Sequence, residues 1–132
     1  MPHCLSPLAR DPSAPLVLVN VRTGLPVASR LIAAFDSATR RQGLLGRTGL
    51  AAGDALILAP CASIHTAFMQ FPIDVLFLDR AGRVLKAVSD VHPWRARMAW
   101  RGFAVVELAG GALATSGTQT GDVVELRTKV QS

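Results

Sequence analysis

The sequence is short of cysteine, of charged residues and of long apolar runs, and each shortage excludes a class of protein. Only 17% of the 132 residues are charged while 50% are hydrophobic, a balance that excludes an intrinsically disordered chain. The two cysteines, Cys4 and Cys61, are too few for a disulfide scaffold, and unpaired thiols are typical of a reducing compartment.

The hydrophobic segments are too short for a membrane protein. None approaches the ~20 residues that a membrane-spanning helix needs. The N-terminus lacks the basic region and apolar core of a secretory signal. We therefore expect a cytoplasmic protein without a membrane span. The net charge of +5 favours an anionic partner only weakly, so nucleic acid is not an expected partner.

The length of the chain fits one domain, which at this size buries roughly two-thirds of its unfolded surface. Residues 1–15 contain Pro2, Pro7, Pro12 and Pro15, a composition that predicts a flexible, extended leader. We expect one β domain over residues 16–128 and a polar tail over residues 129–132.

Short apolar runs separated by turn residues predict most of this domain to be β-strand. The run at residues 73–78 is nearly all apolar, which indicates a strand buried on both faces. Asp36 is predicted to cap one short helix over residues 37–45, with Gly43 inside it. Residues 112–116 suit a single helical turn. The expected fold is therefore mostly β, a compact sandwich of jelly-roll type or a distorted barrel with one short α-helix. The predicted strands cover residues 16–21, 27–35, 55–59, 63–69, 73–78, 83–91, 103–108 and 123–127.

Four motifs resemble, in order and spacing, those of the DUF192 family. They are residues 41–47 (RQGLLGR), 64–79 (IHTAFMQFPIDVLFLD), 106–111 (VELAGG) and 121–122 (GD). The resemblance covers about residues 28–127. It implies a small, mostly β fold of sandwich or jelly-roll type, with no known cofactor or catalytic mechanism. Many members carry an export signal and a Trp-Met pair in the second motif, where this chain has Phe68-Met69.

Cys61, His65 and Met69 are spaced by four residues, so a regular strand would present all three on one face. Thiolate, imidazole and thioether groups suit a soft metal such as copper. However, strand residues four apart are ~13 Å apart, too far to share one ion. Cysteine and methionine are also common in cores. We therefore predict core positions, no metal site and no cofactor.

His65, Asp74 and Glu107 are polar residues within apolar strand segments. Burying a charge is costly unless it is paired, so such residues indicate either a structural network or a functional pocket. The main hypothesis is a binding module for a small polar molecule, a peptide or a glycan. An alternative is a hydrolase that uses His65 with Asp74 or Glu107, although no nucleophile and base are visible at a catalytic spacing. The predicted ligand-binding residues are His65, Thr66, Met69, Asp74, Trp94 and Glu107.

Residues 92–102 are predicted to form a basic, aromatic-rich loop. Its arginines and tryptophans suit contact with an anionic partner. In a simpler interpretation, the tryptophans cover the end of the sandwich while the arginines remain in solvent. A protein-interaction module acting through this loop is therefore the second alternative. The oligomeric state is left open by the sequence. The interaction residues would be Arg95, Arg97, Trp100 and Arg101.

Overall fold

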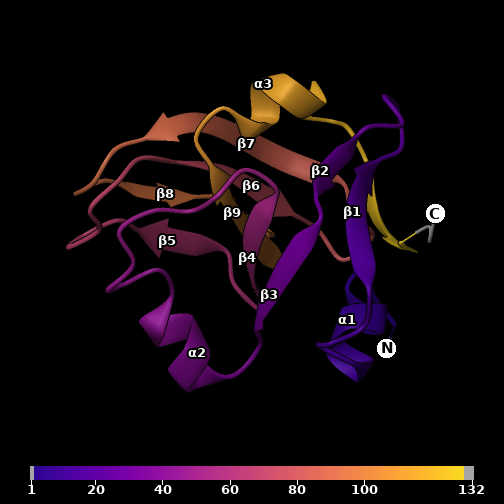
Figure 1. Ribbon diagram of the computed structural model, residues 1–132, viewed down its shortest axis with the longest axis horizontal. Coiled ribbons are helices and arrows are strands. Elements are labelled where there is room, and N and C mark those ends of the chain that lie inside the picture. Colours follow the sequence, from indigo (N-terminus) through magenta and orange to yellow (C-terminus); the bar gives the residue numbers. More distant parts are fainter. Residues whose placement is uncertain (1, 130–132) are drawn as a thin grey trace.

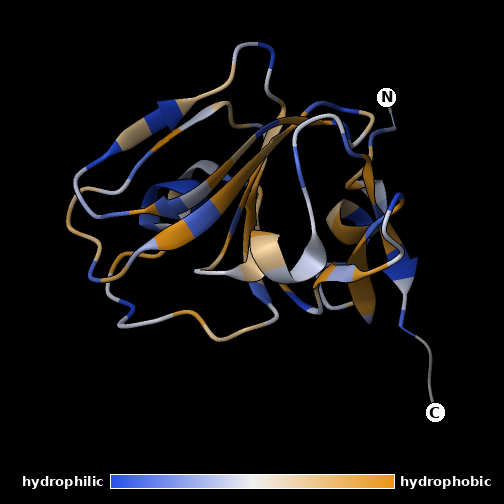
Figure 2. Ribbon diagram, turned by 90° about the horizontal axis from the view of Figure 1, so that it is seen from above, coloured by the Kyte–Doolittle hydropathy of each residue, from blue (hydrophilic) through white to orange (hydrophobic). Residues whose placement is uncertain are grey.

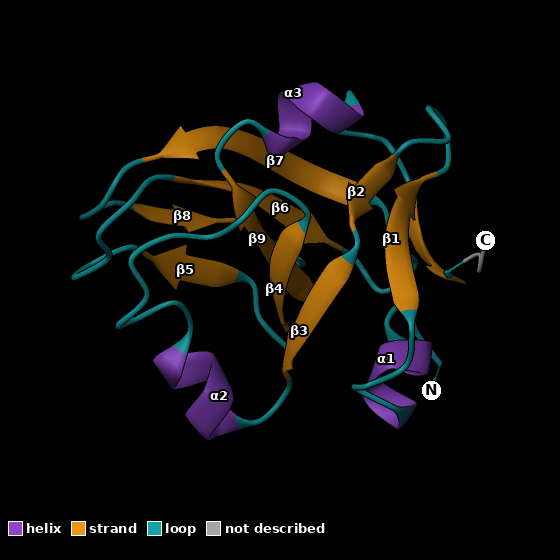
Figure 3. Ribbon diagram, viewed as in Figure 1, coloured by secondary structure: helices purple, strands orange, loops and turns teal. Residues whose placement is uncertain are grey.

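Two packed β-sheets and one smaller sheet form the protein, as Figures 1 and 3 show. The computed structural model describes residues 2–129. Three short helices lie in the connections: α1 (Ser6–Arg10), α2 (Ser37–Gln42) and α3 (Ala112–Ser116). The strands are β1 (Leu16–Asn20), β2 (Pro26–Ala28), β3 (Arg30–Ala34), β4 (Asp54–Leu58), β5 (Ser63–His65), β6 (Ile73–Leu78), β7 (Val84–Val91), β8 (Ala96–Met98), β9 (Ala104–Ala109) and β10 (Val124–Thr128).

The largest sheet has five strands in the order β3-β4-β9-β6-β7, with only β3 and β4 parallel. A three-stranded antiparallel sheet, β10-β1-β2, packs against one of its faces. The pair β5-β8 forms the third sheet. The mostly β, sandwich-like fold is therefore confirmed. Of the three short helices in the described residues, α2 and the helical turn of α3 were expected, and α1 was not.

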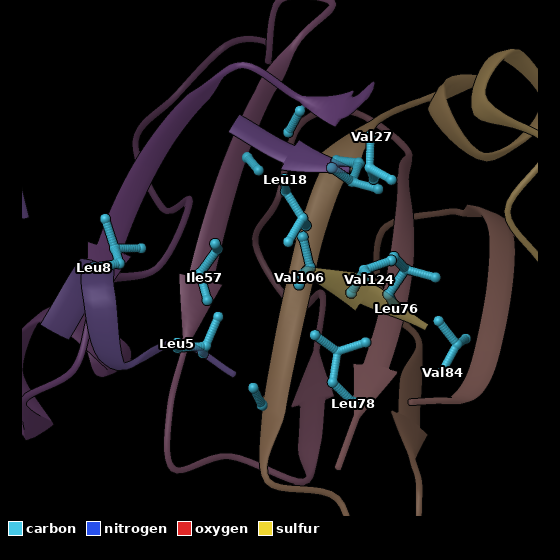
Figure 4. Packing of buried hydrophobic residues seen from close by; sticks show 14 of the residues in the cluster. Leu5, Leu8, Leu18, Val27, Ile57, Leu76, Leu78, Val84, Val106 and Val124 are labelled. Carbon is cyan, nitrogen blue, oxygen red and sulfur yellow. The ribbon is translucent and has the colours of Figure 1, made fainter. Parts of the chain in front are cut away.

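The core has two apolar layers, one on each face of the five-stranded sheet. Leu18, Val27, Leu76, Val106 and Val124 belong to the layer between the two large sheets (Figure 4). The opposite layer lies towards α2 and β5-β8. In Figure 2 the central strands are accordingly orange while blue concentrates in loops and outer strands. Every residue of β6 is buried, which confirms the strand predicted to be covered on both faces.

The N-terminal segment differs from the extended leader predicted for residues 1–15. It contains α1, and Leu5 and Leu8 are 0% and 1% exposed in the core between the large sheets. Leucines three residues apart lie on one side of a helical turn, so both reach the core together. Pro7 is tolerated because it occupies the first turn. Of the predicted tail, residues 130–132 lie outside the described residues.

Helix α2 begins as predicted, at Asp36. The carboxylate of Asp36 accepts a hydrogen bond from the amide of Thr39 (2.8 Å), and the Thr39 hydroxyl accepts one from the amide of Asp36. The helix ends earlier than predicted, because Gly43 follows its last turn with a φ of +48°. Glycine adopts this conformation without the steric penalty of a Cβ atom, so Gly43 ends the helix instead of lying inside it.

Three predicted segments divide differently in the structure. The strand predicted for residues 27–35 becomes β2 and β3, which belong to different sheets. The strand predicted for residues 63–69 ends at His65, and the predicted loop 92–102 contains β8. Strand β8 forms because it pairs with β5, which lies some thirty residues earlier in the chain. Such long-range pairing is not visible in local residue patterns.

The hairpin between β6 and β7 forms at the predicted turn, residues 79–82. The Asp79 carboxylate accepts hydrogen bonds from the amides of Ala81 and Arg83. Gly82 has a φ of +89°, and a Cβ atom there would lie 2.4 Å from the carbonyl oxygen of Val124. Only glycine therefore lets β10 approach this turn so closely.

Candidate functional site

A cavity of about 160 Å³ lies between α2, β5 and the central strand β9. Helix α2 and β5 are neighbours on one side of the molecule (Figure 1). The cavity combines apolar side chains with a few polar groups, the composition typical of a ligand site. Its lining residues are Arg40, Arg41, Gln42, Gly43, Leu44, Leu45, Leu58, Cys61, Ser63, Ile64, His65, Met69 and Glu107.

Glu107 is the unusual member of this lining. It occupies the middle of β9, opposite Leu56 of β4 and Val75 of β6, and is 5% exposed. Its Oε2 atom has no hydrogen-bond partner within residues 2–129. Burial raises the pKa of its carboxyl group to about 7. A buried carboxyl oxygen without a partner is uncommon in folded proteins, and this makes Glu107 a candidate functional group.

The rim of the cavity is basic. Arg40 is held in place because its Nη1 donates hydrogen bonds to the carbonyl oxygens of Phe35 (3.0 Å) and Ala59 (3.3 Å). The neighbouring Arg41 and the side of β5 that carries His65 are exposed. The arrangement places cationic groups at the entrance and a titratable carboxyl group at the base.

Asp74, the other carboxylate predicted for the pocket, lies on the opposite face of the sheet. It pairs with Leu108 in the register, whereas Glu107 pairs with Val75. Because neighbouring strand residues alternate between faces, the Asp74 side chain points towards α3. There it accepts hydrogen bonds from the amides of Leu113 (3.0 Å) and Asp90 (2.9 Å). These bonds join α3 and the end of β7 to β6.

Thr66 and Trp94 also lie away from the cavity lining. The fully buried Thr66 hydroxyl donates to the carbonyl oxygen of His92 (2.7 Å) and accepts from the amide of Arg95 (2.8 Å). It therefore fastens the loop before β8 to the end of β5. Trp94 is 62% exposed and packs edge-on against Phe68, with ring centroids 4.7 Å apart.

Of the six residues predicted to bind a ligand, the structure therefore brings His65, Met69 and Glu107 to one cavity. Arg40 and Arg41 join them there, although the sequence assigned no pocket role to these arginines. Arg41 begins the first family-like motif, residues 41–47, and Arg40 directly precedes it. This position was the feature of the sequence that could have identified them. The use of His65 as a partner of Asp74 in a hydrolase receives no support from these positions.

The described residues contain no group of three or more His, Cys, Asp or Glu side chains suited to hold a metal ion. Cys61 and Met69 do line the cavity with His65. They do not share a regular strand, because β5 spans only Ser63–His65. The Cys61 thiol donates a hydrogen bond to the carbonyl oxygen of Ser63 (3.1 Å).

A second surface surrounds β8 and its two flanking loops. Most of the exposed large apolar side chains are here: Phe68, Trp94, Met98 and Trp100, at 71%, 62%, 60% and 78%. The Arg101 guanidinium lies 4.5 Å from the centre of the Trp100 ring. Arg95 and Arg97 flank Ala96 in the same segment. The predicted basic and aromatic residues thus remain accessible, with Arg97 partly covered.

The backbone around this second surface is strained. The four non-glycine residues with positive φ in the described chain are Phe68, Asp90, Trp94 and Arg101, with φ between 55° and 66°. Phe68 follows β5, Trp94 and Arg101 lie on either side of β8, and Asp90 lies at the end of β7. Left-handed conformations are costly for residues with a Cβ atom, and they concentrate at functional surfaces.

Within residues 2–129, no helix has the length and apolar character needed to cross a membrane.

Comparisons with known proteins place the chain in a family but not in an activity. The model of the DUF192 family, described as "Uncharacterized ACR", matches residues 19–126. A crystal structure of a protein of unknown function from Novosphingobium aromaticivorans is similar, with a TM-score of 0.72 and 26% identity over 84% of this chain and 83% of that one. No curated protein matches.

A second crystal structure, of a putative transcription regulator from Sinorhizobium meliloti, also has a TM-score of 0.72. Its sequence is 20% identical, and the match covers 83% of this chain and 90% of the Sinorhizobium meliloti chain. This likeness concerns the fold alone.

Proposed function

The chain belongs to the DUF192 family, and from this premise we propose that it is a binding protein whose cavity takes a small polar ligand or part of a larger one. The observation that carries the proposal is the carboxyl group of Glu107, buried at the cavity base with an oxygen that has no hydrogen-bond partner among residues 2–129. A buried polar atom without a hydrogen bond destabilises the fold by about 1–3 kcal/mol. A ligand that supplied the missing hydrogen bond would remove this cost.

The chemistry of the lining favours a ligand with two unlike ends. A hydrogen-bond donor would meet Glu107, while an acceptor or an anionic group would meet Arg41 at the entrance. Between Glu107 and Arg41, Leu58 and Met69 offer apolar contact to the middle of the ligand. The cavity, about 160 Å³, is smaller than the roughly 300–1,000 Å³ of sites for drug-sized molecules. It therefore suits a small compound or one segment of a polymer.

A thermal-shift screen of polar acids, amides, sugars and short peptides tests the proposal. A ligand at 100 times its dissociation constant adds about 2.7 kcal/mol of stability. We expect a hit that is lost in Glu107→Gln, which keeps the shape of the side chain, and kept in Glu125→Gln, whose carboxylate is exposed on β10. If every hit shifts the melting temperature of Glu107→Gln as much as that of the wild type, the proposal is contradicted.

Cys61 offers a second readout, because it lines the cavity. Alkylation by N-ethylmaleimide, followed by mass spectrometry, reports each cysteine separately. A bound ligand should slow modification of Cys61. Burial raises the pKa of the Cys4 thiol to about 11, so this residue should react slowly with or without ligand and serves as the internal control.

A second candidate function is the docking of an acidic protein partner on the surface around β8. Its support is the combination of exposed aromatic side chains, accessible arginines and backbone strain in the same loops. Aromatic and arginine residues commonly dominate the energy of protein interfaces. Charge reversal of Arg95 and Arg97 should abolish capture of the partner while Lys129→Glu leaves it unchanged. Equal capture of the partner by the wild type, the charge-reversed variant and Lys129→Glu would remove this candidate function.

A further inference from the structure

Strand β5 has one paired edge and one free edge. Its register with β8 pairs Ser63 with Met98, Ile64 with Arg97, and His65 with Ala96. Within the described chain, β8 is the only strand that β5 pairs with. The other edge of β5 therefore carries main-chain groups that no other strand in the described residues uses.

The hydrogen bonds at both ends of the pair identify which groups these are. The Thr66 amide donates to the carbonyl oxygen of Arg95 (2.8 Å), and the Ala99 amide donates to that of Ala62 (3.0 Å). In an antiparallel pair, bonded and non-bonded residue pairs alternate. The amide and carbonyl groups of Ile64 therefore face β8, while those of Ser63 and His65 face the free edge.

The free edge of β5 borders the cavity. Ser63, Ile64 and His65 all line it, together with α2 on the far side and Glu107 below. In the part of the chain that the structure describes, the Ser63 carbonyl oxygen accepts a hydrogen bond only from the thiol of Cys61 (3.1 Å). A thiol is a weak donor that a stronger one can replace. The site therefore offers main-chain donors and acceptors at strand spacing beside a buried carboxyl group.

We propose that the ligand of this cavity is a short, extended, acidic peptide segment that adds to the free edge of β5 as a further strand. The proposal rests on the proposed function and specifies its ligand class. Peptides recognised in this way gain affinity from main-chain hydrogen bonds and specificity from the side chains that enter pockets. A peptide is favoured over a sugar because its amide and carbonyl groups alternate with the same period as those of Ser63 and His65.

The side-chain preferences follow from the geometry. A peptide residue paired opposite Ile64 points to the same side as Ile64, which packs towards the core. A short donor side chain there, such as that of serine or asparagine, would reach the Glu107 carboxyl group. Glutamates on either side of it would meet Arg41 and His65 at the rim. The net charge of the whole protein, +5, is opposite in sign to that of such an acidic peptide.

The test uses blocked heptapeptides with glutamate at both ends and a varied central residue, with affinities measured by fluorescence anisotropy. Ser63→Pro removes the amide donor at the free edge, where proline is tolerated because β8 does not use that group. Ser63→Ala removes only the side-chain hydroxyl group and keeps the amide donor. We expect Ser63→Pro to weaken the tightest peptide about tenfold relative to Ser63→Ala, the equivalent of roughly 1.4 kcal/mol. Thermal denaturation of both variants checks that they fold.

A second measurement does not depend on any variant. Methylation of the peptide amide nitrogen that pairs with β5 should weaken binding to the unaltered protein by a similar factor. Bound peptide should also slow hydrogen exchange at the amides of Ser63 and His65. Binding that leaves these amides unprotected, or that is equal for Ser63→Pro and Ser63→Ala, would overturn the peptide proposal.

The outcomes also separate the two proposals. A non-peptide hit that requires Glu107 but ignores Ser63→Pro would leave the binding function standing and remove the peptide. If neither peptide binding nor small-molecule binding depends on Glu107, both proposals fail.

Discussion

Asp74 and Glu107 lie on paired strands one register position apart, yet their carboxyl groups face opposite sides of the five-stranded sheet. Asp74 accepts hydrogen bonds from two backbone amides, whereas the Oε2 atom of Glu107 has no partner in the described chain. Two buried carboxyl groups so close in the sheet thus have opposite environments. We expect removal of the first to destabilise the fold and neutralisation of the second to stabilise it.

Glu107→Gln should raise the free energy of unfolding above pH 7. The folded-state pKa of Glu107 is raised by burial to about 7 from an ordinary 4.5, so the folded protein holds its proton more tightly than the unfolded chain. The stability that this proton contributes is complete below pH 4.5 and is lost as the pH rises to about 7. The loss is about 3 kcal/mol. Urea denaturation at a series of pH values measures it.

The comparison with Glu125→Gln isolates this effect. Glu125 is exposed and pairs with Arg127 on the surface of β10, so its neutralisation should leave the pH profile of the wild type unchanged. A Glu107→Gln profile parallel to the wild type between pH 4.5 and 7 would show that Glu107 is already paired in solution.

Asp74→Asn should lower the free energy of unfolding by about 2 kcal/mol, because the charge-assisted hydrogen bonds that Asp74 accepts from the amides of Leu113 and Asp90 are weakened in a buried position. Since Asp74 lies on the far side of the sheet, ligand binding at the cavity should survive in the folded fraction. Calorimetry and the ligand assay together check both statements. Loss of binding without loss of stability would contradict this assignment.

Asp122→Asn should destabilise the protein at neutral pH and have little effect in acid. Hydrogen bonds from Arg22, and also from Asn20 and the amide of Gln119, hold the pKa of Asp122 below its usual value. The stability from this carboxylate is present above its unfolded pKa of about 3.9 and disappears as the pH falls below that. Thermal melts at pH 7 and pH 2 should differ accordingly, the opposite pH trend from Glu107.

Leu5→Ala should lower the free energy of unfolding by about 3 kcal/mol, because a fully buried leucine leaves a cavity when it is truncated. The exposed Ala9→Ser change in α1, the helix that begins directly after Leu5, should have little effect and serves as the control. Chemical denaturation provides the measurement. If both changes are neutral, the N-terminal segment does not contribute to the core in solution.

Trp100→Ser should leave the melting temperature nearly unchanged, since the indole is 78% exposed and surface substitutions usually alter stability by less than about 0.5 kcal/mol. The same change should weaken capture of an acidic partner if the surface around β8 is an interface. Trp100→Ser with unchanged stability and unchanged capture would indicate a tryptophan without a binding role.

Local pattern in the sequence determined the main strands, the N-cap at Asp36 and the turn at residues 79–82. These features depend on neighbours within a few residues, such as the apolar run of β6 and the amides near Asp79. The burial of Leu5 was missed because its partners come from distant strands, and the four prolines nearby indicated an extended chain. Strand β8 was missed for the same reason, since only its pairing with β5 makes it a strand.

The sequence by itself determined the family and the sandwich, and it identified His65, Met69 and Glu107 as residues of interest. Only the tertiary structure decided that these three share a cavity with Arg40 and Arg41 while Asp74 lies on the other face. The physical reason is that the pattern of polar and apolar residues fixes which residues leave water. The register between strands distant in the chain fixes which face each side chain joins.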